Sequence, residues 1–570
     1  MKSLTVHNMS DITKGAPGGP VSNGTNGRVN GGRPDFDKLE TDVIIVGGGF
    51  GGIYGMYKFR KLGLKVNLVE AGAAFGGTWF WNRYPGARVD SETPYYSLAI
   101  PEVFNSWNFS SRFPGHEELR RYFDHMDKTL DLSKDTYFNT IVEGAHYNTD
   151  EGKWKVKSAN GQTATCTYLV MATGSTHKAN YPKFQDLDKY KGVLIHSSRY
   201  PQDLNVSGKK VCVIGSGATG LQIVQTLARE DCQLTACVRT PNFSLPMRQR
   251  NLTAEEQDTA KSYYPAWLHA ARASKGGFPY DNAKGFFDVT PKERQELYEL
   301  LWSRGGFNYV GGNYIEMLFN KDANREIYKF WAEKTRKRVQ DPIKRDIIAP
   351  LEQPYWFATK RPSLEQDYYE MLDRDNVKLI GLKKNPIDRF TANGIRFGGQ
   401  EGFDADFDII ILATGFDAIT GTLVDFGIVG ADGISLQKRW SEGVSTYLGL
   451  MVPHNPNMFM VYSPQAPTAL SNAPPAIEVQ IDWIVDAIKA MREQGITSIT
   501  ADPAAAAKWR ARIHEVFNMT LYPETDSWWN GANVDGKLKE PVLFMEGLDT
   551  YDSVIKDALN GWQGFQTVKA

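Results

Sequence analysis

Two glycine clusters in this chain have the spacing that binds the pyrophosphate of a dinucleotide. Gly47, Gly49 and Gly52 form a G-x-G-x-x-G pattern directly after the apolar run 42–46, and Glu70 follows 18 residues after the last glycine. Such glycines permit a tight turn and a close approach of backbone to pyrophosphate, and the acid accepts hydrogen bonds from ribose hydroxyls. The pattern alone is weak, but here strand, glycines, helix and acid come in order.

The second cluster, Gly215, Gly217 and Gly220, has the same context with one difference. The next strand ends in Arg239 and Thr240 where the first unit has its acid. A guanidinium there suits a 2′-phosphate, which a carboxylate would repel. The alternative is that Arg239 is only a solvated charge at a strand end. The first cluster therefore predicts a site for FAD and the second a site for NADPH.

Two dinucleotide sites on one chain imply hydride flow from nicotinamide to flavin. Disulfide reductases share this layout, but they need a redox cysteine pair near the flavin, and no cysteine precedes Cys166. That family is set aside. The other cysteines, Cys212, Cys232 and Cys237, have no metal-like spacing, so no metal site is expected.

A signature stands between the two clusters, in residues 190–201. It resembles the F-x-G-x-x-x-H-x-x-x-W-P motif of class B flavin monooxygenases, with His196 as its histidine. Two positions depart from the motif, since Tyr190 replaces Phe and Tyr200 replaces Trp. An aromatic residue other than Trp at the last position also suits the sister group that oxidises amines and sulfides. This motif alone leaves the subgroup open.

Residues 77–90 favour one subgroup. They fit the pattern G-x-W-x-x-x-x-[FY]-P-G-x-x-x-D at every fixed position, with Trp79 as its tryptophan and Asp90 as its last residue. The chain resembles the type I Baeyer–Villiger monooxygenases of the cyclohexanone and phenylacetone monooxygenase family from about residue 40 to its C-terminus. Three further segments agree with that family: 360–362, 413–421 and 526–537.

The resemblance implies catalytic roles for Arg361 and Asp90. In this family an arginine beside the flavin stabilises the anionic C4a-peroxyflavin, and an aspartate orients that arginine. A peroxide anion that must persist as a nucleophile needs a fixed cation and a dry site. Lysine fills the role less well because arginine does not readily lose its proton. The alternative is a purely structural Asp90–Arg361 salt bridge.

The resemblance also implies contacts with the cofactors. Lys360, Arg239 and Thr240 are expected to bind the NADPH phosphate, and Trp79 belongs to the flavin side. Trp528 is expected on a mobile loop that closes over NADP+, although it could instead be ordinary core.

Two more segments have an expected role. His196 is expected to position the domain linker and the nicotinamide and not to act as a base, since a lone histidine is more often a structural hydrogen-bonder. The stretch 465–471 resembles the loop that lines the substrate pocket in the family.

The implied reaction converts a ketone, whether cyclic, aryl or linear, to an ester or lactone with NADPH, FAD and O2. The first rival is a flavin monooxygenase that oxidises amines or sulfides, which only Tyr200 favours. The second is an uncoupled NADPH oxidase or a non-enzymatic FAD and NADPH sensor. The sequence does not identify the ketone.

These residues require an α/β fold with two Rossmann-like domains and a helical insertion. A chain of 570 residues exceeds a single core. The two strands that end in Ala-Thr-Gly, 168–174 and 409–415, are expected at sheet edges. The predicted boundaries are a disordered tail at 1–35, an FAD domain at 36–165 and 412–570, an NADP domain at 166–241 and 351–411, and the insertion at 242–350.

Composition limits the partners. The 65 basic and 66 acidic side chains leave a net charge of -1, which gives no reason to propose nucleic acid or an anionic membrane. No apolar run reaches the ~20 residues of a membrane span, and the N-terminus has no secretory pattern. We expect a cytosolic protein with buried thiols, acting on a small ketone as a monomer or weak oligomer.

Overall fold

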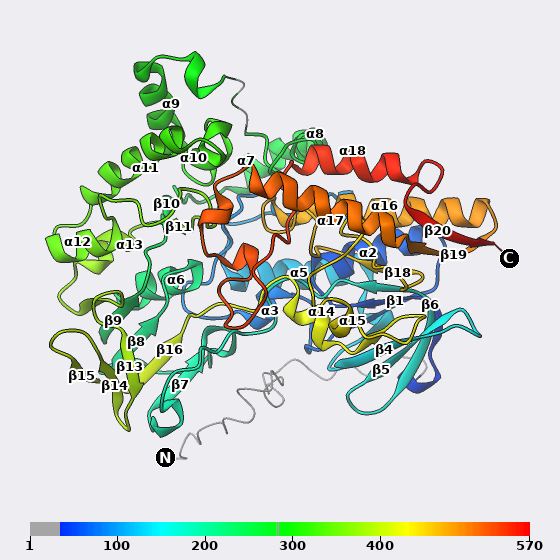
Figure 1. The fold of residues 1–570 in the computed structure, drawn as a ribbon, viewed down its shortest axis with the longest axis horizontal. Helices are drawn as coiled ribbons and strands as arrows, with labels where there is room; N and C mark the ends of the chain where they lie inside the picture. The colour runs from blue at the N-terminus through cyan, green and yellow to red at the C-terminus, as the bar shows by residue number, and fades with distance from the viewer. Residues whose placement is uncertain (1–34, 281, 283, 570) are drawn as a thin grey trace.

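The computed structural model describes residues 35–280, 282 and 284–569. The predicted tail at 1–35 lies outside the described residues except for its last position. The chain forms two sheets side by side, one mixed and mainly parallel and one parallel, each with its own nucleotide-type glycine turn (Figure 1). A group of helices covers both, as the sequence predicts for an α/β fold with a helical insertion.

The first sheet is built around β1, whose apolar run is buried along nearly its whole length because helices and strands cover both of its faces. Helix α2 (Phe50–Lys61) packs between this strand and α16 (Ala473–Glu493), and a Cβ at Gly55 would lie 3.1 Å from Ile45 and 3.5 Å from Ile481. In spatial order the strands are β17 (Ile428–Val429), β4 (Val142–Asn148), β5 (Lys153–Ser158), β6 (Thr163–Met171), β1 (Glu40–Val46), β2 (Val66–Val69) and β3 (Thr136–Tyr137), and β18 (Met458–Met460) also pairs with β6.

The second sheet repeats the unit, with α6 (Ala218–Leu227) following its first glycine turn. Its strands in spatial order are β12 (Val377–Gly381), β9 (Gln233–Val238), β8 (Lys210–Ile214), β16 (Ile409–Leu412) and β7 (Val193–His196). A small antiparallel sheet joins it, made of β13 (Ile387–Phe390), β14 (Gly394–Phe397) and β15 (Phe403–Asp406).

The prediction that the two Ala-Thr-Gly strands lie at sheet edges is wrong. Strand β6 lies between β5 and β1, and β16 lies between β8 and β7. Runs that are apolar at every position are buried on both faces, and such strands belong inside a parallel sheet. This interior position places both Ala-Thr-Gly turns directly beside the glycine clusters.

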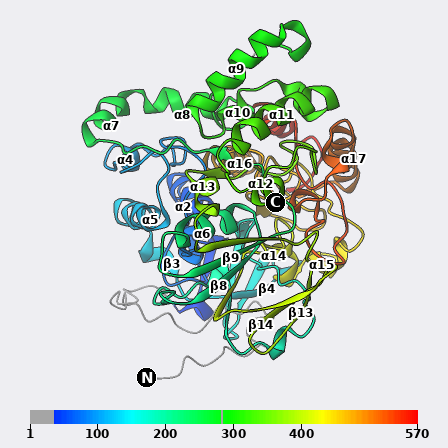
Figure 2. The same cartoon turned by 90° about the vertical axis from the view of Figure 1, so that its left-hand side faces the viewer.

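The part of the chain between β9 and β12 is mainly helical, as the sequence predicts for the insertion. The side chain of Thr253 accepts a hydrogen bond from Glu256 N, and Thr290 and Glu293 form a reciprocal capping box with Pro291 at the first helical position. Figure 2 shows these helices as a layer above the sheets. They are α7 (Ala254–Ala260), α8 (Tyr264–Arg272), α9 (Pro291–Arg304), α10 (Asn308–Gly311), α11 (Lys321–Arg336) and α12 (Pro342–Ile348).

The C-terminal part returns over the first sheet. The stretches 475–494 and 502–519 are helical as predicted, in α16 and α17 (Pro503–Asn518). They are followed by α18 (Leu548–Leu559), and the strands β19 (Ile496–Ala501) and β20 (Phe565–Lys569) pair beside them.

One buried carboxyl lies where α16 crosses the first domain. Glu478 is 2% exposed, its Oε1 accepts a hydrogen bond from Ala99 N at 2.6 Å, and its Oε2 lies 4.0 Å from Arg272 Nη1. Burial raises the pKa of Glu478 to about 7, despite the backbone hydrogen bond and the nearby cations. The arginine has a closer partner in Asp482, at 2.7 Å.

Glu478→Gln should therefore stabilise the protein more at pH 8 than at pH 5. Between the unfolded and the folded pKa the folded state binds more protons, so the contribution of Glu478 to the free energy of unfolding falls as pH rises through about 7. Glutamine keeps an acceptor for Ala99 N and carries no charge. Thermal unfolding at both pH values measures the effect, with the exposed Glu296→Gln as control. An equal shift in Tm at the two pH values would contradict it.

Candidate active site

The first glycine cluster forms a turn that only glycine can make. Gly47 has φ +111°, and a Cβ there would lie 2.4 Å from the carbonyl oxygen of Ala172. A Cβ at Gly52 would lie 2.0 Å from the carbonyl oxygen of Gly47. Gly49 is the N-cap of α2 and offers no capping side chain, so the first N–H groups of this helix are left for a ligand.

Glu70 is fixed beside this turn. Its two oxygens accept hydrogen bonds from Gly48 N and Gly72 N, each at 2.6 Å. Burial raises the pKa of Glu70, and the two backbone hydrogen bonds oppose that shift. Each carboxylate oxygen keeps a lone pair, so the carboxylate can still accept from ribose hydroxyls.

A cavity of about 200 Å³ opens at this turn. Its lining includes Gly47, Gly49, Glu70, Trp79 and Tyr462. A wider hollow of about 560 Å³ lies elsewhere, beside Tyr447, Trp509 and Phe565, and no motif residue lines it. We place the chemistry at the smaller cavity because the glycine turn, the helix N-terminus and the acid converge there.

The second cluster repeats the construction. Gly215 has φ +125°, and a Cβ there would lie 2.3 Å from the carbonyl oxygen of Ala413, while a Cβ at Gly220 would lie 2.1 Å from Gly215 O. Gly217 is the N-cap of α6 and faces open space. In both units the backbone of the alanine in an Ala-Thr-Gly segment packs against the first glycine.

The basic side chains of Arg239 and Lys360 lie near each other at the end of β9. Burial, together with the charges of Arg239 and Lys383, lowers the pKa of Lys360 to about 8, and Asp526 opposes this shift. Arg239 is exposed and has no ion-pair partner within 4 Å among the residues that the structure describes. Thr240 accepts a hydrogen bond from Ser216 Oγ at 2.7 Å through its carbonyl oxygen. Two close cations that Asp526 offsets only in part fit a phosphate.

Asp90 and Arg361 form a bidentate ion pair. Arg361 Nε and Nη2 lie 2.9 and 3.0 Å from the two carboxylate oxygens, and Nη1 donates to Ala469 O at 2.8 Å. The guanidinium lies 4.8 Å from the ring centroid of Phe307. Burial alone would lower the pKa of Arg361, but the charge and hydrogen bonds of Asp90 raise it overall. The site therefore keeps a permanent cation.

The ion pair does not line the cavity itself. Arg361 reaches it through two hydrogen bonds, since Ala469 accepts from Arg361 and its own N–H donates to Tyr462 Oη at 3.0 Å. Tyr462 lines the cavity. The predicted pocket loop 465–471 thus lies between the cavity and the ion pair.

The segment 77–90 touches the second sheet's helix. A Cβ at Gly86 would lie 2.2 Å from Thr226 Oγ1, and Tyr84 Oη donates to Gln222 Oε1 at 3.0 Å, both on α6. Trp79, at the other end of the segment, donates from Nε1 to Tyr96 Oη at 3.0 Å inside the cavity. The fixed positions of this pattern therefore include contacts between the two nucleotide-type units.

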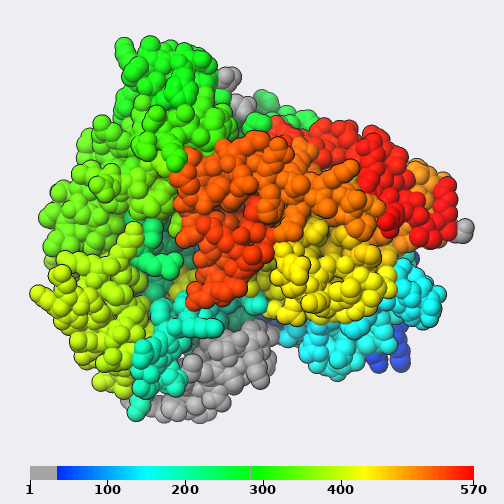
Figure 3. All heavy atoms as spheres, viewed as in Figure 1, coloured from blue at the N-terminus to red at the C-terminus, as the bar shows by residue number. Residues whose placement is uncertain are grey.

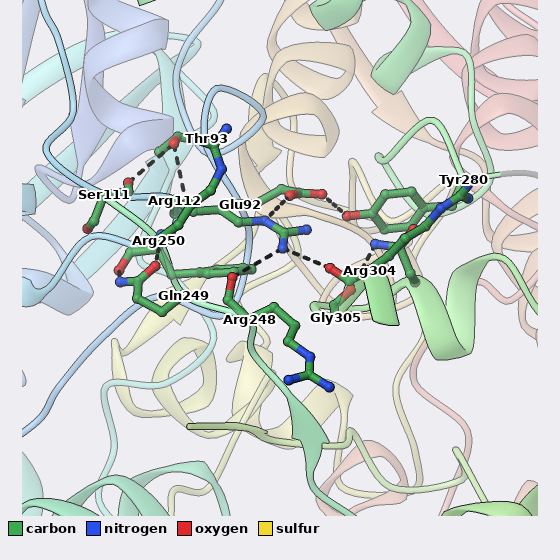
Figure 4. Close-up of polar contacts among 12 residues, drawn as sticks. Glu92, Thr93, Ser111, Arg112, Arg248, Gln249, Arg250, Tyr280, Arg304 and Gly305 are labelled. Atoms are coloured by element: carbon green, nitrogen blue, oxygen red, sulfur yellow. Dashed lines mark hydrogen bonds and ion pairs between the residues drawn. The ribbon is translucent and has the colours of Figure 1, made fainter. Parts of the chain in front are cut away.

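The same loop is anchored to the helical insertion by residues that we did not predict (Figure 4). Arg112 Nε lies 2.5 Å from Glu92 Oε2, and its Nη1 donates to the carbonyl oxygens of Arg304 at 2.8 Å and Arg248 at 3.4 Å. Tyr280 donates from its hydroxyl to the other oxygen of Glu92. Glu92 follows the motif aspartate by two positions, which is the only hint that the sequence offers.

His196 lies at the end of β7 and does not line the cavity. Its Nε2 lies 3.1 Å from Gly415 O, and its Nδ1 lies 3.2 Å from Ser198 N. Burial lowers the pKa of His196 to about 4, so the ring is neutral, with Nε2–H donating and Nδ1 accepting. These contacts join β7 to the Ala-Thr-Gly turn after β16, and an effect on the nicotinamide stays a prediction.

Figure 3 shows the orange-red part of the chain extending over this face toward the green and teal segments of the second unit. Trp528 begins the short 3₁₀ turn η9 (Trp528–Asn530) in the C-terminal part of the chain. It is partly exposed, and its ring lies 5.5 Å from that of Trp529. Asn533 Nδ2 donates to Phe416 O at 2.9 Å, and Lys537 Nζ lies 2.5 Å from Asp417 Oδ1. Trp528 does not line the cavity, whereas Asp526, two residues earlier, acts on the pKa of Lys360.

This chain matches known proteins in sequence and in fold. Residues 41–262 match the family described as pyridine nucleotide-disulphide oxidoreductase. The chain is 42% identical to the FAD-binding monooxygenase acrE of Aspergillus aculeatus, over 94% of this chain and 90% of that protein. It is 38% identical to the cyclopentanone 1,2-monooxygenase of a Comamonas species, over 95% and 97%.

Solved structures agree. The closed crystal structure of cyclohexanone monooxygenase superposes with a TM-score of 0.89 at 32% identity, over 93% of this chain and 100% of that chain. The structure of OTEMO in complex with FAD and NADP gives a TM-score of 0.88 at 32% identity and the same coverage. As for metals, no group of three or more His, Cys, Asp or Glu side chains placed to hold an ion occurs among the described residues.

Removing the cation at the end of β9 should weaken binding of NADPH and not of NADH. Arg239→Ala loses one charge-assisted contact, worth roughly 1.5 to 3 kcal/mol or about 10- to 100-fold in affinity. Titration of the protein with both coenzymes measures the effect, and NADH, which lacks the 2′-phosphate, is the internal control. Equal losses for the two coenzymes would refute the assignment.

The second cation predicts a pH dependence. With its pKa at about 8, Lys360 is mostly charged below that pH and mostly neutral above it, whereas the coenzyme's 2′-phosphate is already mostly ionised at pH 7. The dissociation constant for NADP+ should therefore rise between pH 7 and pH 9. In Lys360→Arg the rise should disappear because the guanidinium stays charged. Identical pH profiles for wild type and variant would contradict a role of Lys360 at the phosphate.

Proposed function

This chain belongs to the type I Baeyer–Villiger monooxygenases, and on that premise we propose how its residues turn a ketone into an ester or lactone. Relatives at 42% and 38% identity cover over nine-tenths of it. It is a FAD-containing, NADPH-dependent oxidoreductase, and the rival activities on amines or sulfides are not favoured. The observation that carries the mechanism is the Asp90–Arg361 pair, two hydrogen bonds away from the cavity.

We assign FAD to the first glycine turn. The free N–H groups at the start of α2 suit its pyrophosphate, and Glu70 suits its ribose. Gly47 and Gly49 line the cavity, while Gly52 allows the helix to pack against the turn. Trp79 lines the same cavity on the flavin side.

We assign NADPH to the second turn, with Gly215, Gly217 and Gly220 at the pyrophosphate. Arg239 and Lys360, which Asp526 offsets only in part, are proposed to bind the 2′-phosphate together with the adjoining Thr240. Trp528 is proposed to contact the bound coenzyme, supported by the position of Asp526 near Lys360.

When bound and reduced, the flavin would activate O2, and one of the two oxygen atoms of O2 is the atom inserted beside the carbonyl. Arg361 supplies a positive charge that neither titrates nor moves. Five N–H donors are available on a guanidinium, and three are used by Asp90 and Ala469, so two remain for the negative charge that develops in the reaction.

Asp90 holds the guanidinium in one orientation. Its two hydrogen bonds fix the plane of the arginine, which a single contact would leave free to rotate. The surroundings also limit water, since Phe307 covers one face of the guanidinium and Phe278 lies 6.1 Å from Phe307 between ring centroids. These aromatic rings support an apolar ketone as substrate.

We keep the domain boundaries as a proposal with one change: β6 (Thr163–Met171), which crosses the boundary at 165/166, pairs with β1 and β5 and belongs to the first sheet. The first sheet takes β17 and β18 from the part after residue 412, which supports an FAD domain of two segments, 36–165 and 412–570. The second sheet takes β12 and most of β16 from 351–411, beside three strands from 166–241.

We also propose a cytosolic location. All four cysteines are free and buried, which suits a reducing compartment. No helix among the described residues is long and apolar enough to cross a bilayer. That the active protein is a monomer or a weak oligomer stays a prediction.

Arg361→Ala should bind FAD and be bleached by NADPH without oxygen, yet form ester about 100 to 1,000 times more slowly. Hydride transfer needs the nicotinamide in place and not this charge. Ester is measured by product chromatography and hydrogen peroxide by a peroxidase assay, and peroxide should replace ester. Arg361→Lys should also be impaired because a lysine cannot reproduce the bidentate geometry.

The exposed Arg304→Ala is the matched control and should keep full ester yield. A near-normal rate of ester formation by Arg361→Ala would mean that another cation stabilises the negative charge that develops in the reaction. A wild-type protein that consumes NADPH and makes only peroxide with every ketone would instead favour the NADPH oxidase.

A further inference from the structure

Tyr462 lines the cavity and has a strained backbone. It follows β18 with φ +55°, a conformation that bulky residues rarely adopt. Its N–H donates to Gln480 Oε1 at 2.7 Å, which secures this conformation from α16. The side chain lines the cavity together with Trp79 and Tyr96.

The hydroxyl of Tyr462 has a free donor. Its oxygen accepts from Ala469 N at 3.0 Å, and the carbonyl of the same alanine accepts from Arg361 Nη1 at 2.8 Å. No acceptor for the phenolic hydrogen is found within the described ranges of the chain. A phenol carries one O–H donor, so this hydrogen is left for a molecule bound beside Tyr462.

We propose that Tyr462 donates a hydrogen bond to the carbonyl oxygen of the ketone, a catalytic contact that rests on the proposed function. When the oxygen nucleophile adds to the carbonyl carbon, a C–O bond forms and the π pair of the C=O bond moves onto the carbonyl oxygen. The hydrogen bond stabilises that charge, and no proton is transferred. The electron pair on the carbonyl oxygen then re-forms the C=O bond. At the same time a carbon substituent migrates to the inserted oxygen, and the leaving group departs with the electrons of its bond to that oxygen.

A phenol is a suitable donor beside Arg361. Burial raises the pKa of Tyr462, although the arginine opposes this, so the hydroxyl stays protonated and is a weak acid. It can stabilise a developing alkoxide without protonating the nucleophile. Arg361 and Tyr462 would then serve two different oxygens, the nucleophile and the carbonyl.

Tyr462→Phe tests the contact with two substrates. Addition to a ketone places charge on a carbonyl oxygen, whereas oxidation of a thioether does not. The variant should lose about 100-fold in ester formation, in the range for loss of one oxyanion donor, and less than about 2-fold in sulfoxide formation. Anaerobic reduction by NADPH should be unchanged.

Tyr551→Phe is the matched control. Tyr551 Oη donates to Leu448 O at 2.6 Å and accepts from Gln480 Nε2 at 3.1 Å, so this variant loosens the same glutamine without removing a hydroxyl from the cavity. It should leave the ratio of ester to sulfoxide at the wild-type value. A similar loss of both products in Tyr462→Phe would make the residue structural and overturn the proposal.

Infrared spectroscopy gives a readout besides activity. With a carbon-13 labelled ketone on oxidised holoenzyme and NADP+, the carbonyl stretch should lie at lower frequency in the wild type than in Tyr462→Phe, because a hydrogen bond weakens the C=O bond. Equal frequencies, or equal ester rates in both proteins, would overturn the contact. A wild type that makes no ester from any ketone would refute the proposed function and not this residue alone.

Discussion

The ion pair between Asp90 and Arg361 joins residues 271 positions apart and sets the geometry around it. Both side chains are about a quarter exposed, at 26% and 25%, so each loses much of its hydration. A half-buried pair is stabilising only if its hydrogen bonds are well made. Two bonds to the carboxylate and one to Ala469 meet that condition, and they require the loop after Trp79, the segment after Lys360 and the loop 465–471 to meet at one point.

Those segments meet because the nucleotide-type units are fixed against each other. Gly86 allows α6 to approach the motif loop, and Glu92 with Arg112 ties the same loop to the helical insertion. His196 joins β7 to the turn after β16 as a neutral hydrogen-bonding group. The residues that determine the position of Asp90 are therefore mostly contacts between units, and few of them touch a cofactor.

The parts of this arrangement that depend on local backbone geometry could be predicted from sequence. Gly47 and Gly215 have φ values that other residues avoid, so the G-x-G-x-x-G spacing predicts this backbone conformation directly. The position of a strand within its sheet could not be predicted, because an apolar run such as that of β6 is compatible with an edge and with the interior. The predicted edge position was wrong. Glu92 and Arg112 were missed because their partners Tyr280, Arg248 and Arg304 are far away in sequence. Tyr462 was missed because no sequence pattern marks a tyrosine with positive φ.

The chain uses its cations in two ways, and the difference follows from what each must do. Arg239 and Lys360 lie close together without a carboxylate within ion-pair distance in the described structure. Asp526 offsets their mutual repulsion and the desolvation of Lys360 only in part, so an incoming anion would relieve both further. Arg361 is already neutralised by Asp90 and keeps spare donors. A binding site benefits from unpaired charge, because the ligand supplies the missing partner. A site that stabilises a transient charge needs a group that is already in place, because reorientation during the reaction would raise the barrier.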